Sequence, residues 1–294
     1  MGFYSPHALL QAAKRDGVKV LPVCINHSTW DTSLERPTEE EDPCIRLGFN
    51  MVRGLSKVGA DHLVSFRSKR GIWSDLDAFL RQSPLYRNDL TALTATGALS
   101  CLDVERRAAI WIAEAVPYAP LMEEDLKASF PEEDPLTQAE RDFESFGTTL
   151  GDHPSLIIKK QFWCFQPTIK ELVPAHQLAN KPNNLMVKTF GMILVRQAPA
   201  TAKGMVFFTL EDEHGFFNLA FTPQVYARYR QIINGQGFLC TEGKLQKSGE
   251  SHSILISKVY EPQVPEAEVI DLHKGDDPIE VVTRKTLSRA RNYM

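Results

Sequence analysis

LVRQAPATAKGMVFFTLEDEHG, residues 194–215, is the stretch of this sequence that decides the fold of its C-terminal half. Apolar residues alternate with others along 206–210, and they alternate again along 217–221. The alternating apolar residues are Val206, Phe208, Leu210, Phe217, Leu219 and Phe221. Such a period of two is typical of strands that bury one face, and the acidic turn at 211–215 predicts an antiparallel hairpin between them.

The segments on both sides of this hairpin complete a five-stranded barrel. We expect strands over 185–195, 205–210, 216–221, 238–246 and 253–260, with a helix from 222 to 233 between the third and the fourth. An OB-fold requires this order, and OB-folds most often bind single-stranded nucleic acid or oligosaccharide. Gly191 and Gly243 fall inside strands, where a tightly curved barrel needs bends or bulges.

Length and composition fit a soluble globular chain of about two domains. The 294 residues carry a net charge of −4, and no apolar run approaches the ~20 residues that span a bilayer. The N-terminus lacks the features of a signal peptide and the five cysteines are scattered, so we expect free thiols, a cytoplasmic location and no membrane partner. Nucleic-acid binders are usually basic, but the acidic residues here gather in a few segments, so the net charge does not decide the partner.

The N-terminal segment is expected to form a helix and then a strand. Ser5 and Pro6 suit the start of the helix, Gly17 suits its end, and the strand covers 18–25. This segment is too short to bury a core alone, so it is expected to be the edge of a larger domain.

Short helices are expected over 47–116. Asp103 is predicted to cap one of them, whose apolar face consists of Val104, Ala108, Trp111 and Ala115. The following segment, 117–145, is rich in proline and acidic residues, so we expect a loose linker there.

Residues 54–59, GLSKVG, are the main candidate for a phosphate-binding turn. A helix follows, which is the pattern of a helix-hairpin-helix. Such a turn directs backbone N–H groups and the positive end of a helix dipole at a phosphate, and glycine lets the DNA backbone come close. Lys57 stands at the usual first glycine and adds a positive charge. Residues 96–98, TGA, are a second candidate, and a plain helical turn is the alternative for both.

Basic and aromatic side chains accompany the strands of the expected barrel. They are Lys188, Arg196, Lys203, Lys244 and Lys247, beside Phe190, Phe207 and Phe216. Aromatic rings can stack on bases while cations follow the phosphates. Phe207 alternates with inward-facing residues, so we expect it to point outward. The alternative is that most of these rings belong to the core and that the cations are simply solvated.

Carboxylates are the remaining candidates for chemistry. Asp75 and Asp77 have the spacing of a pair that could hold metal ions, but they stand at the start of a helix, where acids favour the dipole. Residues 211–213 are expected to form a hairpin turn. Cys24-x-x-His27 lacks a second ligand pair nearby, so no zinc site is predicted. The sequence offers no complete catalytic constellation.

Several segments resemble the C-family bacterial DNA polymerases, and three of them are closest to the error-prone branch. Residues 1–35 resemble a stretch near the end of the fingers region, and residues 195–215 resemble the OB domain. The helix-hairpin-helix entry is resembled by residues 46–63, RLGFNMVRGLSKVGADHL, and the connecting segment by residues 143–154, FESFGTTLGDHP. Together they cover most of the chain in the order of the family. The resemblance implies DNA-templated DNA synthesis, often across damaged template.

The expected fold is α+β and multidomain. A helical helix-hairpin-helix domain is followed by a five-stranded OB-fold β-barrel, with a short α/β remnant of a fingers domain at the N-terminus. The predicted divisions are 1–46 for the fingers remnant, 47–116 for the helix-hairpin-helix region, 117–184 for the linker and connecting segment, 185–262 for the OB-fold and 263–294 for the tail.

The resemblance places the duplex contact on the first hairpin and the single-strand contact on the barrel. For the duplex backbone the predicted residues are Arg53, Gly54, Lys57 and Gly59. For the single strand they are Lys188, Arg196, Lys203, Gly204, Phe207 and Lys244. No catalytic residue and no metal ligand is predicted in this chain.

The palm and the phosphoesterase-like domain of the family have no counterpart in this sequence. We therefore expect a C-terminal fragment that binds DNA without polymerising it alone and needs no cofactor, the magnesium of the full-length family lying in the palm. Expected partners are primer-template and single-stranded DNA, lesion-bypass accessory proteins and a sliding clamp, although 121–130 matches a clamp-binding peptide poorly. The alternatives are a non-catalytic protein-interaction module of a lesion-bypass assembly and a hydrolase that uses Asp75 and Asp77.

Overall fold

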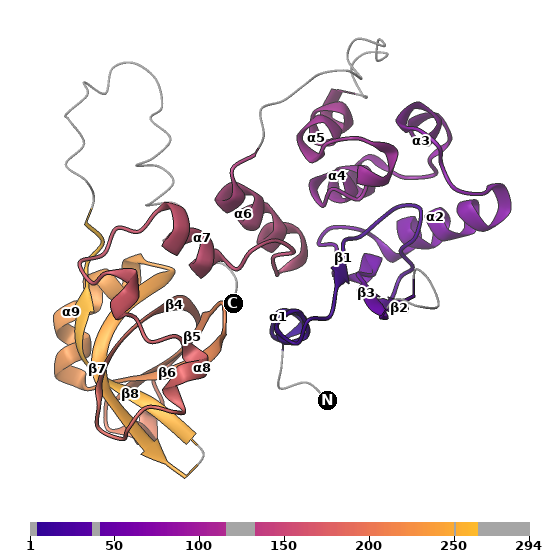
Figure 1. The fold of residues 1–294 in the computed structure, drawn as a ribbon. Coiled ribbons are helices and arrows are strands. Elements are labelled where there is room, and N and C mark those ends of the chain that lie inside the picture. Colours follow the sequence, from indigo (N-terminus) through magenta and orange to yellow (C-terminus); the bar gives the residue numbers. More distant parts are fainter. Residues whose placement is uncertain (1–4, 37–41, 116–132, 250, 264–294) are drawn as a thin grey trace, which may run out of the picture. The chain divides into compact units, whose positions relative to one another are not determined.

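The computed structural model describes four stretches of the chain, which fall into two compact units, residues 1–151 and 152–294 (Figure 1). The described residues are 5–36, 42–115, 133–249 and 251–263. The segment 121–130 that was compared with a clamp-binding peptide lies outside them, as does nearly all of the predicted tail. No helix in the described ranges is long and apolar enough to cross a bilayer.

Unit 1 consists mainly of helices beside a small sheet. The helices are α1 (Pro6–Arg15), η1 (Phe49–Met51), α2 (Lys57–Arg70), α3 (Leu76–Gln82), α4 (Arg87–Ala95), η2 (Ser100–Leu102), α5 (Arg106–Ala115) and α6 (Pro135–Phe146). The strands are β1 (Val20–Leu21), β2 (Ser33–Glu35) and β3 (Cys44–Arg46). They form a sheet in the order β1-β3-β2, in which β1 is parallel and β2 antiparallel to β3.

The first helix is as predicted, but the strand after it is shorter than predicted. The predicted cap is confirmed, since the Ser5 side chain accepts a hydrogen bond from the N–H of Ala8. The prediction of a strand over 18–25 is wrong beyond Leu21. The next residue, Pro22, has no N–H to donate to a sheet, and the chain then turns away.

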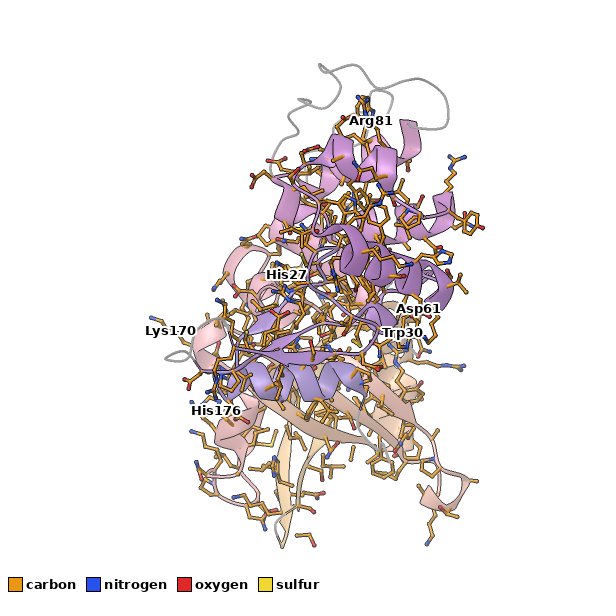
Figure 2. All side chains as sticks on the ribbon, turned by 90° about the vertical axis from the view of Figure 1, so that its right-hand side faces the viewer. His27, Trp30, Asp61, Arg81, Lys170 and His176 are labelled. Carbon is orange, nitrogen blue, oxygen red and sulfur yellow. The ribbon has the colours of Figure 1, made fainter. Side chains whose placement is uncertain are left out.

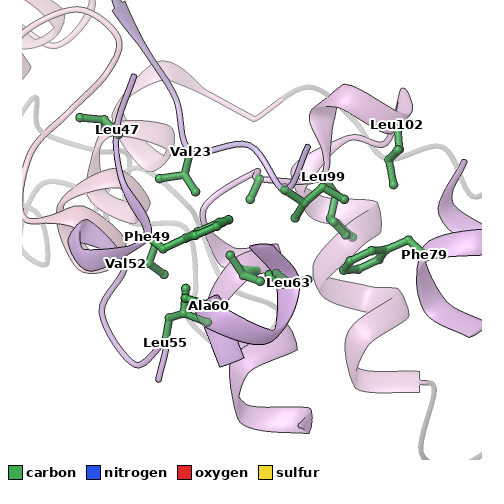
Figure 3. Packing of buried hydrophobic residues seen from close by; sticks show 14 of the residues in the cluster. Val23, Leu47, Phe49, Val52, Leu55, Ala60, Leu63, Phe79, Leu99 and Leu102 are labelled. Carbon is green, nitrogen blue, oxygen red and sulfur yellow. The ribbon is translucent and has the colours of Figure 1, made fainter. Parts of the chain in front are cut away.

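The core of unit 1 draws on both the N-terminal segment and the hairpin region (Figure 3). Val23, Phe49 and Leu63 are fully buried, and Leu99 is 1% exposed. These residues come from the segment before β2, from η1, from α2 and from the turn after α4. The residues assigned to a fingers remnant therefore pack into the same core as the helices that follow.

Helix α5 begins later than predicted and buries a different face. Asp103 has φ of 57°, in the left-handed region, and the helix begins at Arg106, so the predicted cap is wrong. Trp111 was predicted on the buried face but is 37% exposed. The buried residues are Ala108, Ala109, Ile112 and Ala113. The face shifts because Val104 lies outside the helix and does not belong to its period.

Helix α6 occupies part of the segment that was predicted to be a loose linker. Asp134 caps it by accepting hydrogen bonds from N–H groups of the first turn, and Pro135 follows at the first helical position. Within the helix, Asp142 is 1% exposed and lies 2.7 Å from the guanidinium of Arg106. The proline and the acids that indicated a linker therefore begin a helix and fix it to α5.

Unit 2 is built around a closed barrel, and the predicted OB-fold is confirmed. Its strands are β4 (Met186–Gln197), β5 (Val206–Asp212), β6 (Gly215–Phe221), β7 (Phe238–Ser248) and β8 (Ser251–Tyr260), in the order β4-β5-β6-β8-β7. Its helices are α7 (Pro154–Gln161), η4 (Ile169–Glu171), α8 (Ala175–Leu178), η5 (Ala200–Ala202) and α9 (Pro223–Gly235). Neighbouring strands are antiparallel except β6 and β8, which pair in parallel at two positions, Leu219↔Ile254 and Ala220↔Leu255.

The barrel interior is the one that the alternating pattern predicts. All six alternating apolar residues of β5 and β6 are at most 9% exposed. The two glycines inside strands are required by close backbone contacts. A Cβ atom at Gly191 would lie 2.7 Å from the carbonyl oxygen of Glu211, and one at Gly243 would lie 2.4 Å from that of Leu255. A register shift between Glu242 and Gly243 confirms a bulge at the second glycine.

The acidic turn between β5 and β6 does more than reverse the chain. Asp212 is 1% exposed, and its carboxylate accepts hydrogen bonds from N–H groups of the turn and from the N–H of Ala175. Glu213 accepts from Nζ of Lys159 at 2.9 Å and from Oγ of Ser155 at 2.8 Å. The turn therefore attaches α7 and α8 to the barrel.

Candidate nucleic-acid interfaces

The first hairpin turn has the geometry of a capped helix start. Gly54 has φ of 86°, a conformation that favours glycine, and Leu55 is buried beneath the turn. Ser56 caps α2, and its Oγ accepts a hydrogen bond from the N–H of Gly59 at 2.9 Å. The backbone of the turn is thus fixed before any ligand arrives.

A buried carboxylate from α4 already occupies part of this helix start. Asp89 is 4% exposed and accepts hydrogen bonds from the N–H of Ser56 at 2.7 Å and from Oγ of Ser56 at 3.0 Å. A Cβ atom at Gly59 would lie 2.4 Å from Oδ2 of Asp89. Gly59 therefore makes room for Asp89. Within the described stretches, the N–H groups of Lys57 and Val58 are left without an acceptor.

Most of the residues predicted for the duplex contact lie at the surface of this turn. Arg53, Gly54 and Lys57 are exposed, whereas Gly59 is buried. Nζ of Lys57 lies 2.9 Å from the carboxylate of Asp61 and 5.4 Å from the ring centroid of Trp30; Figure 2 labels both partners. The ion pair is more than half exposed on both sides, so it holds the lysine weakly.

The second candidate turn is a helix end. Thr96 and Ala98 are buried, and Gly97 has φ of 73° at the C-terminus of α4. The carbonyl of Ala98 accepts a hydrogen bond from the N–H of Ile25, and the carbonyl of Thr96 accepts one from the guanidinium of Arg106. These contacts match the alternative of a plain helical turn.

The barrel carries a polar groove on the outer face of β5 and β6. Its volume is about 670 Å³, and it extends to the loop before β4 and to the hairpin between β7 and β8. Its lining residues are Asn183, Asn184, Gln197, Phe207, Thr209, Asn218, Gln246, Lys247, Ser248, Ser251, His252 and Ser253. No carboxylate stands among these described lining residues. OB-folds bind oligonucleotides at this position.

The groove is held in shape by hydrogen bonds between its walls. Oγ1 of Thr209 lies 2.9 Å from Oδ1 of Asn218 across the β5–β6 pair. The N–H of Lys247 donates to Oδ1 of Asn183 at 3.1 Å, and Nζ of Lys247 donates to a backbone carbonyl of the segment after α8. His252 stands opposite Lys247 in the β7–β8 hairpin. Amide and hydroxyl groups therefore dominate the surface around Phe207.

The predicted single-strand residues are divided between this groove and other places. Phe207 lines the groove and is half-buried. Lys203 and Gly204 are exposed in the loop between β4 and β5, and Lys244 is exposed on β7. The structure brings these residues to the outside of the barrel, as predicted, but places Phe207 alone among the groove residues.

Two predicted cations and one aromatic ring have other contacts. Lys188 donates to the carboxylate of Glu171, which lowers the pKa of that carboxyl to about 2. The guanidinium of Arg196 donates to the carbonyl of Gln236 and lies 5.4 Å from the ring centroid of Phe208. Phe190 is 2% exposed and belongs to the core, packed against Trp163, Phe165 and Phe238.

The carboxylates considered for metal chemistry do not converge. Asp75 caps α3 by accepting a hydrogen bond from the N–H of Ala78, which is the chief cause of its lowered pKa. Asp77 lies 2.8 Å from Nε of Arg81, one turn further along the helix. Each carboxylate thus has its own contact at α3, as the interpretation of a helix start predicts.

Sequence reasoning missed most of the groove. Thr209, Asn218, Gln246 and His252 are uncharged polar residues of a kind common on any surface. A signal was present, because Thr209 and Asn218 occupy outward positions of two strands whose inward positions were known. Charge was used as the guide instead. It led to Lys247, which lines the groove, but also to Lys188 and Arg196, which have other contacts.

Comparisons with known proteins show which sequences and structures this chain is similar to. A family described as "Helix-hairpin-helix motif" matches residues 17–109. The error-prone DNA polymerase of Anaeromyxobacter dehalogenans is 32% identical over 271 residues, 88% of this chain and 23% of the relative. That of Alkalilimnicola ehrlichii is 35% identical over 254 residues, 85% of this chain and 24% of the relative. The chain thus spans about a quarter of the length of the curated relatives it matches.

Among solved structures, a small single-stranded DNA binding protein from Mycoplasma pneumoniae aligns with a TM-score of 0.25 and 15% identity. The alignment covers 29% of this chain and 99% of that protein. The Stn1–Ten1 complex of S. pombe aligns with a TM-score of 0.24 and 15% identity, over 29% of this chain and 61% of that one.

Proposed function

Because the chain is homologous along most of its length to a segment of the error-prone DNA polymerases, we propose that it is the DNA-binding part of such an enzyme. In this proposal unit 1 holds the backbone of duplex DNA, unit 2 holds single-stranded template, and neither polymerises DNA alone. The observation that carries the proposal is the polar groove on the outer face of β5 and β6, free of carboxylates among its described residues.

The first hairpin supports a contact with one duplex phosphate. The N–H groups of Lys57 and Val58 lie in the first turn of α2, where the helix dipole favours an anion. The side chain of Lys57 is exposed at the same turn, and Arg53 is exposed just before it, with its guanidinium near Gly147. Asp89 satisfies the deeper donors, so a phosphate would meet the outer part of the helix start.

The groove supports a contact with an unpaired strand. Phe207 offers a ring on which a base can stack, a contact worth ~1–3 kcal/mol. Amide groups such as Asn218 and Gln246 can donate to and accept from base edges. Lys247 on β7 lines the groove, and Lys203 stands in the loop between β4 and β5; both can follow the phosphates.

Fluorescence anisotropy tests the proposal by measuring how the full chain binds labelled single-stranded and duplex oligonucleotides. We expect modest affinity, roughly 10⁻⁴ to 10⁻⁶ M at physiological salt. Lys57→Glu should weaken duplex binding. Arg81→Glu is the matched control, since it makes the same charge change in another exposed i,i+4 ion pair of unit 1 and should leave binding unchanged.

Two results would contradict the proposal. Equal binding by the wild-type chain and the Lys57→Glu variant would remove the hairpin contact. Extension of a primer by the purified chain with nucleotides and magnesium would show that it polymerises DNA alone. Retention of partner proteins at high salt without any DNA binding would instead favour the alternative, a non-catalytic interaction module. Clamp and lesion-bypass partners and a cytoplasmic location remain predictions.

A further inference from the structure

Two cysteines far apart in the sequence meet at the turn that follows α4 in unit 1. The carbonyl oxygen of Ala98 accepts a hydrogen bond from the N–H of Ile25 at 3.1 Å, and Sγ of Cys101 lies 3.8 Å from the same oxygen. The side chain of Cys24, next to Ile25, is hydrogen-bonded to that of Cys101. Cys24 is 4% exposed, whereas Cys101 is exposed to solvent.

The surroundings of Cys24 stabilise a thiolate. Its sulfur accepts hydrogen bonds from the Cys101 thiol and from the N–H groups of Asn26 and His27, and the His27 ring, labelled in Figure 2, adds a favourable charge. The hydrogen bond from the Cys101 thiol is the largest of these causes; together they lower the pKa of Cys24 to about 6, against the opposing effect of burial. Donation to Cys24 raises the pKa of Cys101. Near neutral pH the two sulfurs thus share one proton.

We propose that Cys24 and Cys101 are a redox-active pair that forms a reversible disulfide by exchange with low-molecular-weight disulfides. The pair combines a solvent-exposed sulfur with a buried partner in hydrogen-bonding contact. Intracellular disulfides of this kind are usually transient and redox-sensing. The other buried thiols, Cys44 and Cys240, are 1% and 0% exposed. Burial and then the charge of Cys164 raise the pKa of Cys240, but among the described residues no hydrogen bond joins those two thiols.

The exchange has two steps. When the shared proton resides on Cys24, the exposed thiolate of Cys101 attacks one sulfur of a small disulfide RSSR, forms a mixed disulfide and releases RS⁻, which takes the proton from Cys24. The Cys24 thiolate then attacks Sγ of Cys101, breaks the mixed disulfide and releases a second RS⁻, which takes a proton from water. Two protein thiols are oxidised by two electrons, and RSSR is reduced to two RSH.

The bond would link the first hairpin of unit 1 to the segment after α4 through the turn that carries Cys24. Arg67 of α2, the helix of the first hairpin, donates to the carbonyl of Ile25 at 2.8 Å and to that of Ser28 at 2.9 Å. The turn that carries Cys24 is therefore already fixed to α2. A covalent link to Cys101 would fix the same turn to the segment after α4.

Incubation of the full chain in glutathione buffers of increasing disulfide content tests the proposal. After trapping of free thiols, a non-reducing digest and mass spectrometry should yield a Cys24–Cys101 peptide pair that dithiothreitol separates. In Cys24→Ser, Cys101 should stop at the mixed disulfide with glutathione, because the attacking thiolate is gone. Cys164→Ser, which changes a half-buried cysteine of unit 2, should leave the cross-link unchanged.

The contrary result is equally clear. If Cys101 of the wild-type chain accumulates as a stable glutathione adduct while Cys24 is trapped as a free thiol, the two sulfurs do not react with each other and the proposal fails. It also fails if Cys164 is modified at a glutathione ratio that leaves Cys101 unreacted. Circular dichroism of each variant confirms that the comparison is between folded chains.

Discussion

The hairpin of unit 1 and the groove of unit 2 would both contact DNA, yet they present different chemical groups to it. At the hairpin, Lys57 and the start of α2 offer positive charge, and a buried carboxylate, Asp89, supports the turn from beneath. In the groove, a half-buried ring and uncharged polar side chains prevail. The hairpin should therefore depend on charge and salt, and the groove on stacking and hydrogen bonds.

The largest effect is expected from Asp89→Ala. This change leaves the N–H and the hydroxyl of Ser56 without their buried acceptor, at a cost of roughly 3 kcal/mol in the free energy of unfolding of unit 1. Duplex binding should fall with the loss of the turn, while single-strand binding persists. Thermal unfolding and anisotropy measure both. A parallel loss of single-strand binding would mean that the two surfaces do not act separately.

Phe207→Ala should have the next largest effect, and it should act on the other surface. Loss of one stacking ring should weaken single-strand binding by about 1–3 kcal/mol, with duplex affinity unchanged. Phe190→Leu is a useful companion, because that ring is buried and a conservative change there should leave single-strand affinity as it was. If Phe207→Ala binds a single strand as tightly as wild type does, the groove is not the site.

A salt titration sharpens the comparison further. The slope of log K against log salt should be steeper for duplex than for single-stranded DNA, since the duplex contact depends more on displaced counterions. Lys57→Gln should lower the duplex slope by about one and leave the single-strand slope unchanged. Equal slopes for the two ligands would contradict the idea that the hairpin depends more on charge than the groove does.

The smallest effect is expected from Lys188→Ala. The ammonium group already donates to Glu171, so its loss should change single-strand affinity less than twofold, in contrast to the site predicted from the sequence. The same change should raise the pKa of Glu171 from about 2 towards the ordinary glutamate value of 4.5. Because the folded pKa is depressed, the contribution of this pair to stability is present above pH ~4.5 and is lost as pH falls towards 2. A carboxyl titration by nuclear magnetic resonance measures the shift.

The barrel could be predicted from the sequence because its information is local. Alternation along β5 and β6 identifies the inward face, and Gly243 marks a bulge that the structure contains. The contacts of the candidate sites could not be predicted in the same way. Asp89 reaches Ser56 from another helix, and Glu171 neutralises Lys188 from another segment, so neither partnership leaves a pattern in its own neighbourhood.

Composition misled the interpretation in two places. Proline and acidic residues indicated a linker where Asp134 and Pro135 begin α6, because the same residue types serve loops and helix starts. A cluster of lysines and arginines indicated the single-strand site, although the guanidinium of Arg196 donates to the carbonyl of Gln236 and lies over the ring of Phe208. Most residues of the groove are uncharged, so a search guided by charge finds Lys247 and passes over the rest.

The short parallel pairing of β6 with β8 gives the barrel a preferred place to open. Two residue pairs hold this seam, whereas β8 is paired with β7 along nearly its whole length. Local opening of the barrel should therefore separate β6 from β8 first. The backbone amides of these two strands should exchange with deuterium sooner than those of the other barrel strands. The groove spans this seam, with Asn218 on one side and Ser253 on the other. A strand of DNA bound there would contact both strands, hold them together and slow that exchange.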